Sequence, residues 1–110
     1  MASISFSKDN GWVAAAWVMY YFLEHALPLL EPDTELRRRV ENTVREEVQF
    51  LDLVGVSDTE KECLLRALVK ALANLRGNGP SSMSVPEAYS GLVSRGEELI
   101  EELRRSLRQP

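Results

Sequence analysis

Residues 12–23 read WVAAAWVMYYFL, and this stretch decides the expected fold because it is apolar on every side of a helix. Such a helix is either surrounded by other elements or spans a membrane. A spanning helix needs about 20 apolar residues, whereas this run ends at Glu24 and His25. We therefore expect a buried helix over residues 11–26, ended by Pro28, and no membrane span.

Helical periodicity continues downstream of this stretch. The expected helices cover residues 34–54, 58–76 and 85–108. In the first of them the apolar residues recur at helical spacing: Leu36, Val40, Val44, Val48 and Leu51. Ser57 to Glu60 have the form of a capping box, and Gly55 and Gly77 stand where helices commonly end. With residues 11–26, these segments predict an all-α fold, a four-helix bundle.

Two segments lie outside the expected helices. Residues 1–10 form a polar lead-in, in which the alternation of Ile4 and Phe6 suits a brief extended arm. Residues 77–84, GNGPSSMS, form a linker rich in Gly, Pro and Ser. A length of 110 residues fits one domain, so residues 1–110 are expected to form a single helical domain.

Composition excludes several classes of function. A net charge of −4 and a pI of about 5.0 argue against nucleic-acid binding, which needs a cationic surface. The single cysteine, Cys63, cannot form an internal disulfide, and the N-terminal residues lack the pattern of a signal peptide. These features predict a cytoplasmic location.

One enzymatic hypothesis rests on the acidic pairs of the last expected helix. Four carboxylates lie close together on this helix and offer the oxygen ligands that Mg²⁺ prefers: Glu97, Glu98, Glu101 and Glu102. Helical nucleotide pyrophosphohydrolases hold Mg²⁺ with paired Glu-x-x-Glu and Glu-x-x-Asp segments, to which this spacing is similar. Only the first half of that pattern is present, so the family is not assigned. A solvated face with ion pairs is the favoured interpretation, and no metal or cofactor is expected.

Three other features have a structural interpretation beside a chemical one. Glu24 and His25 suit acid–base chemistry, but they also suit the end of a helix that emerges into solvent. Residues 37–39, three arginines, suit a phosphate or an acidic partner, yet flanking glutamates favour a salt-bridged helix face. Cys63 suits a half-buried apolar position better than a reactive thiol. No catalytic residue is assigned.

The aromatic residues of the first expected helix give the functional hypothesis. Five of the eight aromatics fall within eleven residues: Trp12, Trp17, Tyr20, Tyr21 and Phe22. Trp and Tyr dominate the energetics of protein interfaces. We predict a non-enzymatic interaction module of the inhibitor, immunity or adaptor type, which binds another protein or a second copy of itself through Trp12, Trp17, Tyr20 and Tyr21. The alternatives are the Mg²⁺-dependent enzyme and a bundle that binds a hydrophobic ligand.

Overall fold

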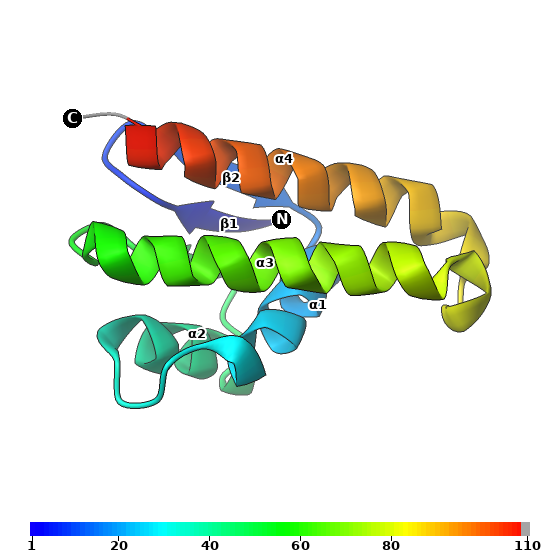
Figure 1. Ribbon diagram of the computed structural model, residues 1–110, viewed down its shortest axis with the longest axis horizontal. Helices are drawn as coiled ribbons and strands as arrows, with labels where there is room; N and C mark the ends of the chain where they lie inside the picture. Colours follow the sequence, from blue (N-terminus) through cyan, green and yellow to red (C-terminus); the bar gives the residue numbers. More distant parts are fainter. Residues whose placement is uncertain (109–110) are drawn as a thin grey trace.

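The computed structural model describes residues 1–108, and within them the chain forms four α-helices and a three-stranded sheet (Figure 1). The predicted all-α four-helix bundle is therefore wrong, and the fold is α+β. The elements in chain order are β1 (Ala2–Ser5), β2 (Gly11–Ala14), α1 (Ala16–Ala26), α2 (Glu35–Arg45), β3 (Phe50–Asp52), α3 (Asp58–Asn78) and α4 (Tyr89–Arg108). Short 3-10 helices cover Leu27–Leu29, Pro80–Ser82 and Pro86–Ala88.

β1 is the central strand of the sheet, in the order β2-β1-β3. It pairs with β2 in antiparallel register, Ile4 opposite Trp12, and with β3 in parallel register, Ile4 opposite Leu51. All three of these side chains are buried, so they form one row on the inner face of the sheet. The helices cover this face, and the opposite face stays open.

The helix expected over residues 11–26 is shorter than predicted and begins at Ala16. Residues 11–14 form β2 instead, in which Trp12 and Ala14 are buried while Gly11 and Val13 are exposed. This alternation has the period of a strand, but it is hidden in a run that is almost entirely apolar. The short hairpin to β1 then fixes residues 11–14 as a strand, because it satisfies their backbone groups.

The helix expected over residues 34–54 is also wrong beyond Arg45, where α2 ends. Glu47 has a positive φ of 54°, which turns the chain out of the helix. Phe50 and Asp52 are exposed while Leu51 and Leu53 are buried, and Leu51 pairs with β1. Here the period of two, combined with pairing to a distant strand, overrides the helical spacing of Val48 and Leu51.

The later helices are close to the predicted ranges. Ser57 caps α3 by accepting a hydrogen bond of 3.2 Å from the Glu60 N–H, which confirms the predicted helix start. α3 passes through Gly77 and ends before Gly79, whose φ of 73° suits glycine. α4 begins at Tyr89, because residues 86–88 form a 3-10 turn where the helix was expected.

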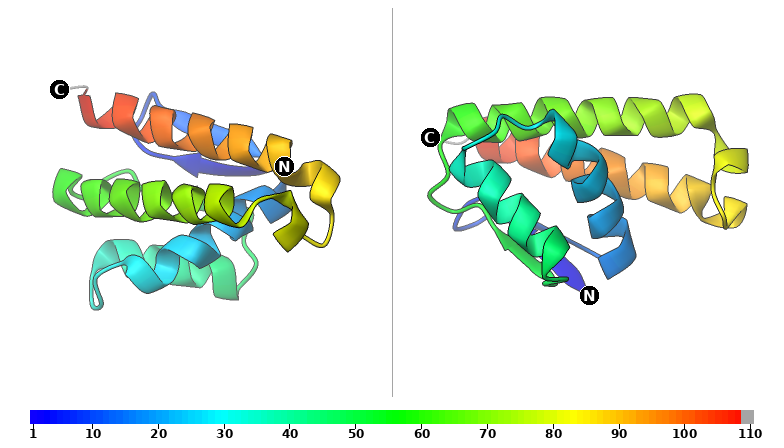
Figure 2. Two further views of the ribbon diagram at one scale, coloured as in Figure 1. Left: turned by 45° about the vertical axis from the view of Figure 1, so that its right-hand side comes forward. Right: turned by 90° about the horizontal axis from the view of Figure 1, so that it is seen from below.

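α3 and α4 run side by side in opposite directions, and β1 and β2 lie behind them in the view of Figure 1. α1 and α2 lie on the side of α3 that faces away from α4, as the left view of Figure 2 shows. The buried side chains of the sheet and of all four helices join into one hydrophobic core. Within the described residues, no helix has the length and apolar character needed to cross a membrane.

Two residues of the core, one charged and one without a side chain, determine how these elements pack. Lys61 of α3 is 7% exposed and donates a hydrogen bond of 2.7 Å from Nζ to the carbonyl oxygen of Phe6, just after β1. Gly96 of α4 lies against the ring of Phe22, where a Cβ would come within 2.5 Å of Cζ. Its lack of a side chain therefore sets how closely α4 approaches α1.

Candidate interaction surface

Each glutamate of the proposed Mg²⁺ site forms an ion pair with an arginine. The N–O distances are 3.2 Å for Glu97 with Arg76, 2.8 Å for Glu98 with Arg95, 3.1 Å for Glu101 with Arg108 and 2.7 Å for Glu102 with Arg105. Among the described residues, no three His, Cys, Asp or Glu side chains are grouped so that they could hold a metal ion. The arrangement is that of a solvated helix face.

Glu24 and His25 are both exposed at the end of α1. The Nδ1 atom of His25 lies 2.7 Å from the carbonyl oxygen of Tyr21, and the two rings stack with their centroids 4.2 Å apart. Burial raises the pKa of the Tyr21 hydroxyl. These contacts anchor the imidazole on its own helix and bring no nucleophile to it.

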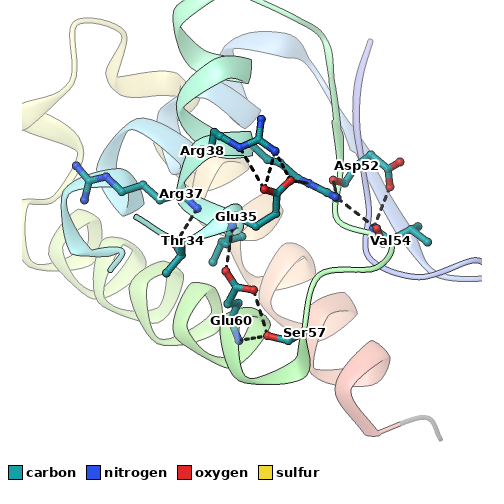
Figure 3. Close-up of polar contacts among 10 residues, drawn as sticks. Thr34, Glu35, Arg37, Arg38, Asp52, Val54, Ser57 and Glu60 are labelled. Atoms are coloured by element: carbon teal, nitrogen blue, oxygen red, sulfur yellow. Dashed lines mark hydrogen bonds and ion pairs between the residues drawn. The ribbon is translucent and has the colours of Figure 1, made fainter. Parts of the chain in front are cut away.

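The arginines of residues 37–39 take part in a polar network between α2, α3 and the end of β3 (Figure 3). The carboxylate of Glu35 accepts hydrogen bonds from Arg38 and, at 2.8 Å, from Nε of Arg39. Hydrogen bonds from Arg38 first and Arg39 second lower the pKa of Glu35 to about 2. Arg37 instead binds the carbonyl oxygen of Leu30 at 2.8 Å.

The same network connects the starts of two helices. One carboxylate oxygen of Glu60 accepts a hydrogen bond of 3.1 Å from the N–H of Leu36, in the first turn of α2. The other accepts from the Ser57 hydroxyl at 3.2 Å, so Glu60 serves the N-termini of α2 and α3 together. Each group is paired within the protein, which favours the salt-bridged helix face that the sequence predicted.

The free edge of β3 is closed by a side chain of this network. Nη1 of Arg39 donates hydrogen bonds to the carbonyl oxygens of Asp52 (2.9 Å) and Val54 (3.2 Å). The carboxylate of Asp52 accepts from the Val54 N–H at 2.9 Å. These contacts occupy the outward carbonyl oxygen of Asp52 and both backbone groups of Val54, so they hinder the pairing of another strand at this end of β3.

The four aromatic residues of the predicted interface have different environments. Trp12 is 4% exposed in the core, where its Nε1 has no hydrogen-bond partner among the described residues. Trp17, in the first turn of α1, is 51% exposed. Tyr20 is half-buried and donates a hydrogen bond of 2.9 Å to the carbonyl oxygen of Val48, and Tyr21 stacks on His25. Of the four, Trp17 is best placed to contact a partner.

Trp17 belongs to a group of exposed apolar side chains at one end of the sheet. β1 and β3 begin at this end, β2 finishes there, and α1 starts two residues later. Five of the nine large apolar side chains that are exposed among the described residues come from this end. We call them the apolar end surface: Met1, Val13, Trp17, Val48 and Phe50.

The register of the sheet explains how these residues gather. Val13 and Phe50 both lie opposite Ser3, one on each side, so they flank β1 on the open face. They are 53% and 47% exposed. Met1 and Trp17 line the same hollow of about 620 Å³, with Ala14 to Val18 and the start of α4. The end surface therefore runs from the open face of the sheet to the first turn of α1.

Sequence reasoning missed every member of the end surface except Trp17. The signal was present in the alternation of residues 11–14 and 50–53, because a period of two puts Val13 and Phe50 on the face opposite Trp12 and Leu51. Only the pairing of three strands from distant segments brings these outward positions together.

Cys63 is half-buried on α3 and packs against the core, as expected of a small apolar residue. Comparisons with protein-family models, with curated proteins and with solved structures found no match for this chain. What the chain does must therefore be inferred from its own residues.

Proposed function

We propose that this chain is a non-enzymatic protein-interaction module that self-associates through the apolar end surface. The observation that carries this proposal is the concentration of exposed apolar side chains at one end of the sheet. Isolated exposed apolar residues are normal, but a contiguous patch of several hundred Å² marks an interaction site. Trp17 adds an anchor of the residue type that contributes most to interfaces.

The contacts of the two candidate catalytic groups, the acidic residues of α4 and His25, support a binding role rather than catalysis. The acidic residues of α4 are all engaged by arginines, and His25 is held against Tyr21. A role as an inhibitor, an immunity factor or an adaptor stays a prediction, since each of these works through protein contacts.

The test is the molar mass in solution, measured by light scattering over a wide range of concentration, for the wild type and two variants. Trp17→Glu puts a carboxylate in the first turn of α1, where the helix dipole favours it, so the fold should survive. Val69→Glu is the control, because Val69 is an exposed apolar residue of α3 outside the end surface.

We expect the wild type and Val69→Glu to form dimers and Trp17→Glu to be a folded monomer. A wild type that stays monomeric at every concentration would contradict the proposal. So would a Trp17→Glu variant with the mass of the wild type.

A second candidate function is the binding of an apolar ligand in the hollow beside Trp17. Its walls are mostly apolar, with the guanidinium of Arg95 as the charged group. Native mass spectrometry distinguishes this function, because a ligand retained by the monomer adds mass that Trp17→Glu should lose. A monomer of unmodified mass would contradict it.

A further inference from the structure

We infer that β2 is the strand through which two copies of this chain pair, so that their sheets join into one. The inference rests on the proposed function, because it specifies which strand joins the copies. It is carried by the backbone of β2, whose outward side has no partner.

Hydrogen bonds on the other side of β1 determine which backbone groups of the sheet are outward. Ser3 donates to the carbonyl oxygen of Gln49 at 3.0 Å, and Leu53 donates to the carbonyl oxygen of Ser5 at 2.8 Å. Residues 3 and 5 of β1 therefore face β3. Because backbone groups alternate along a strand, Ile4 faces β2.

The alternation continues into β2. Phe6 donates to the carbonyl oxygen of Asn10 at 2.9 Å, so the even-numbered residues of both strands bond across the hairpin. Gly11 and Val13 direct their N–H and C=O groups away from β1. No hydrogen bond reaches these groups from any residue between 1 and 108, and both residues are exposed.

The two edges of the sheet differ in how they are protected. Natural proteins protect an edge strand with charges, proline, a bulge or a covering side chain. The edge of β3 has the guanidinium of Arg39 and the carboxylate of Asp52 on its backbone. β2 has the sequence GWVA, without a charge or a proline, and it pairs with β1 in continuous register. Its edge is therefore suited to pairing.

A second copy complements this edge when the strands run antiparallel about a two-fold axis at Trp12. Gly11 of one copy then lies opposite Val13 of the partner subunit, and Val13 opposite Gly11 of the partner subunit. Every outward N–H meets an outward C=O in this register, so no backbone group of the edge stays unsatisfied. A two-fold axis requires this self-complementarity.

Charges favour a second copy over an unrelated strand. The same register brings the hairpin tip of one copy, with Lys8 and Asp9, beside the Trp17 hollow of the other copy. α4 lies along this hollow through Arg95, which forms an ion pair with Glu98. Asp9 of the tip thus approaches Arg95 of the partner subunit, and the tip covers Trp17 of the partner subunit.

Two substitutions at one position test the inference. Val13→Pro removes the outward N–H and fills the space of the pairing strand, yet it breaks no hydrogen bond to β1. Val13→Thr is the matched control, since it keeps the N–H and a β-branched side chain but reduces the apolar surface. Molar mass and backbone hydrogen exchange are measured for both variants and for the wild type as concentration rises.

We expect the wild type and Val13→Thr to dimerise and Val13→Pro to be a folded monomer. In the wild type, the Gly11 and Val13 amides should exchange quickly when dilute and at least tenfold more slowly in the dimer. The exchange measurement on the wild type tests pairing through β2 even if Val13→Pro does not fold.

The outcomes separate the two proposals. A wild-type dimer in which the Gly11 and Val13 amides stay unprotected would overturn pairing through β2 and leave self-association in place. A wild type that is monomeric at every concentration would overturn both, whether or not another protein binds the edge.

Discussion

The guanidinium of Arg39 extends from α2 to the end of β3 and donates a hydrogen bond of 2.9 Å to the carbonyl oxygen of Asp52. This contact joins α2 to β3, which follows it closely in the chain. The rest of the sheet to which β3 belongs comes from the N-terminal strands β1 and β2. The Arg39 contact also occupies an outward carbonyl oxygen of β3, through which another strand would otherwise pair.

Replacing Arg39 should therefore lower the stability of the protein more than replacing Arg38. Arg39→Ala removes the bonds to the edge as well as the pair with Glu35, whereas Arg38→Ala removes only the exposed pair. We expect Arg39→Ala to lower the free energy of unfolding by about 1 kcal/mol more than Arg38→Ala, because hydrogen bonds from a charged donor are worth more than a surface ion pair.

Urea unfolding of the two variants measures this difference. The open edge in Arg39→Ala should also increase aggregation on storage relative to Arg38→Ala. Equal losses of stability in the two variants would show that the edge contacts contribute nothing.

The low pKa of Glu35 predicts a dependence of stability on pH. This pKa is about 2 in the folded protein, against 4.5 for an unperturbed glutamate. Because the folded state binds the proton less tightly, the contribution of Glu35 is complete above pH 4.5 and is lost as the pH falls towards 2. The carboxylate is accessible to solvent, so salt should reduce the contribution.

Glu35→Gln is the variant that isolates this contribution. The difference in free energy of unfolding between wild type and Glu35→Gln should be constant above pH 4.5 and should shrink between pH 4.5 and 2. A difference that does not change across this window would contradict the hydrogen bonds from Arg38 and Arg39.

Two glycines of α4 should respond to alanine in opposite directions. A Cβ at Gly96 would lie 2.5 Å from Cζ of Phe22 and 3.1 Å from Cδ1 of Leu72, so Gly96→Ala should destabilise the protein by about 1–3 kcal/mol. A Cβ at Gly91 meets nothing within 4 Å, so Gly91→Ala should stabilise it by up to about 1 kcal/mol.

Thermal unfolding of both variants at low concentration measures the two effects. If both substitutions raised the melting temperature, then α4 would not pack against Phe22 as closely as the structure has it.

Part of the fold was predictable from local chemistry. The capping box at Ser57 and the periodic leucines located α3, and two ion pairs of α4, Arg95 with Glu98 and Arg105 with Glu102, follow from charges three residues apart. These features depend on residues within one helix, so no knowledge of the tertiary structure was needed.

The sheet was not predictable in the same way. Residues 11–14 and 50–52 are strands because each pairs with β1, which has only four residues. In the sequence, only the alternation of Ile4 and Phe6 suggested that this segment is extended. Short segments with apolar residues at both helical and strand spacing are ambiguous until a distant partner selects one.

The sequence by itself determined where α3 and α4 lie, the mild negative charge and the aromatic enrichment of residues 12–22. Only the tertiary structure decided that Trp12 lies in the core while Trp17 is exposed, and that Met1, Val13, Val48 and Phe50 share its end of the sheet. The physical reason is that helix caps and charge pairs act over a few residues. Strand pairing instead joins segments that are far apart in the chain, and a side chain of these segments becomes buried only when the sheet packs against the helices.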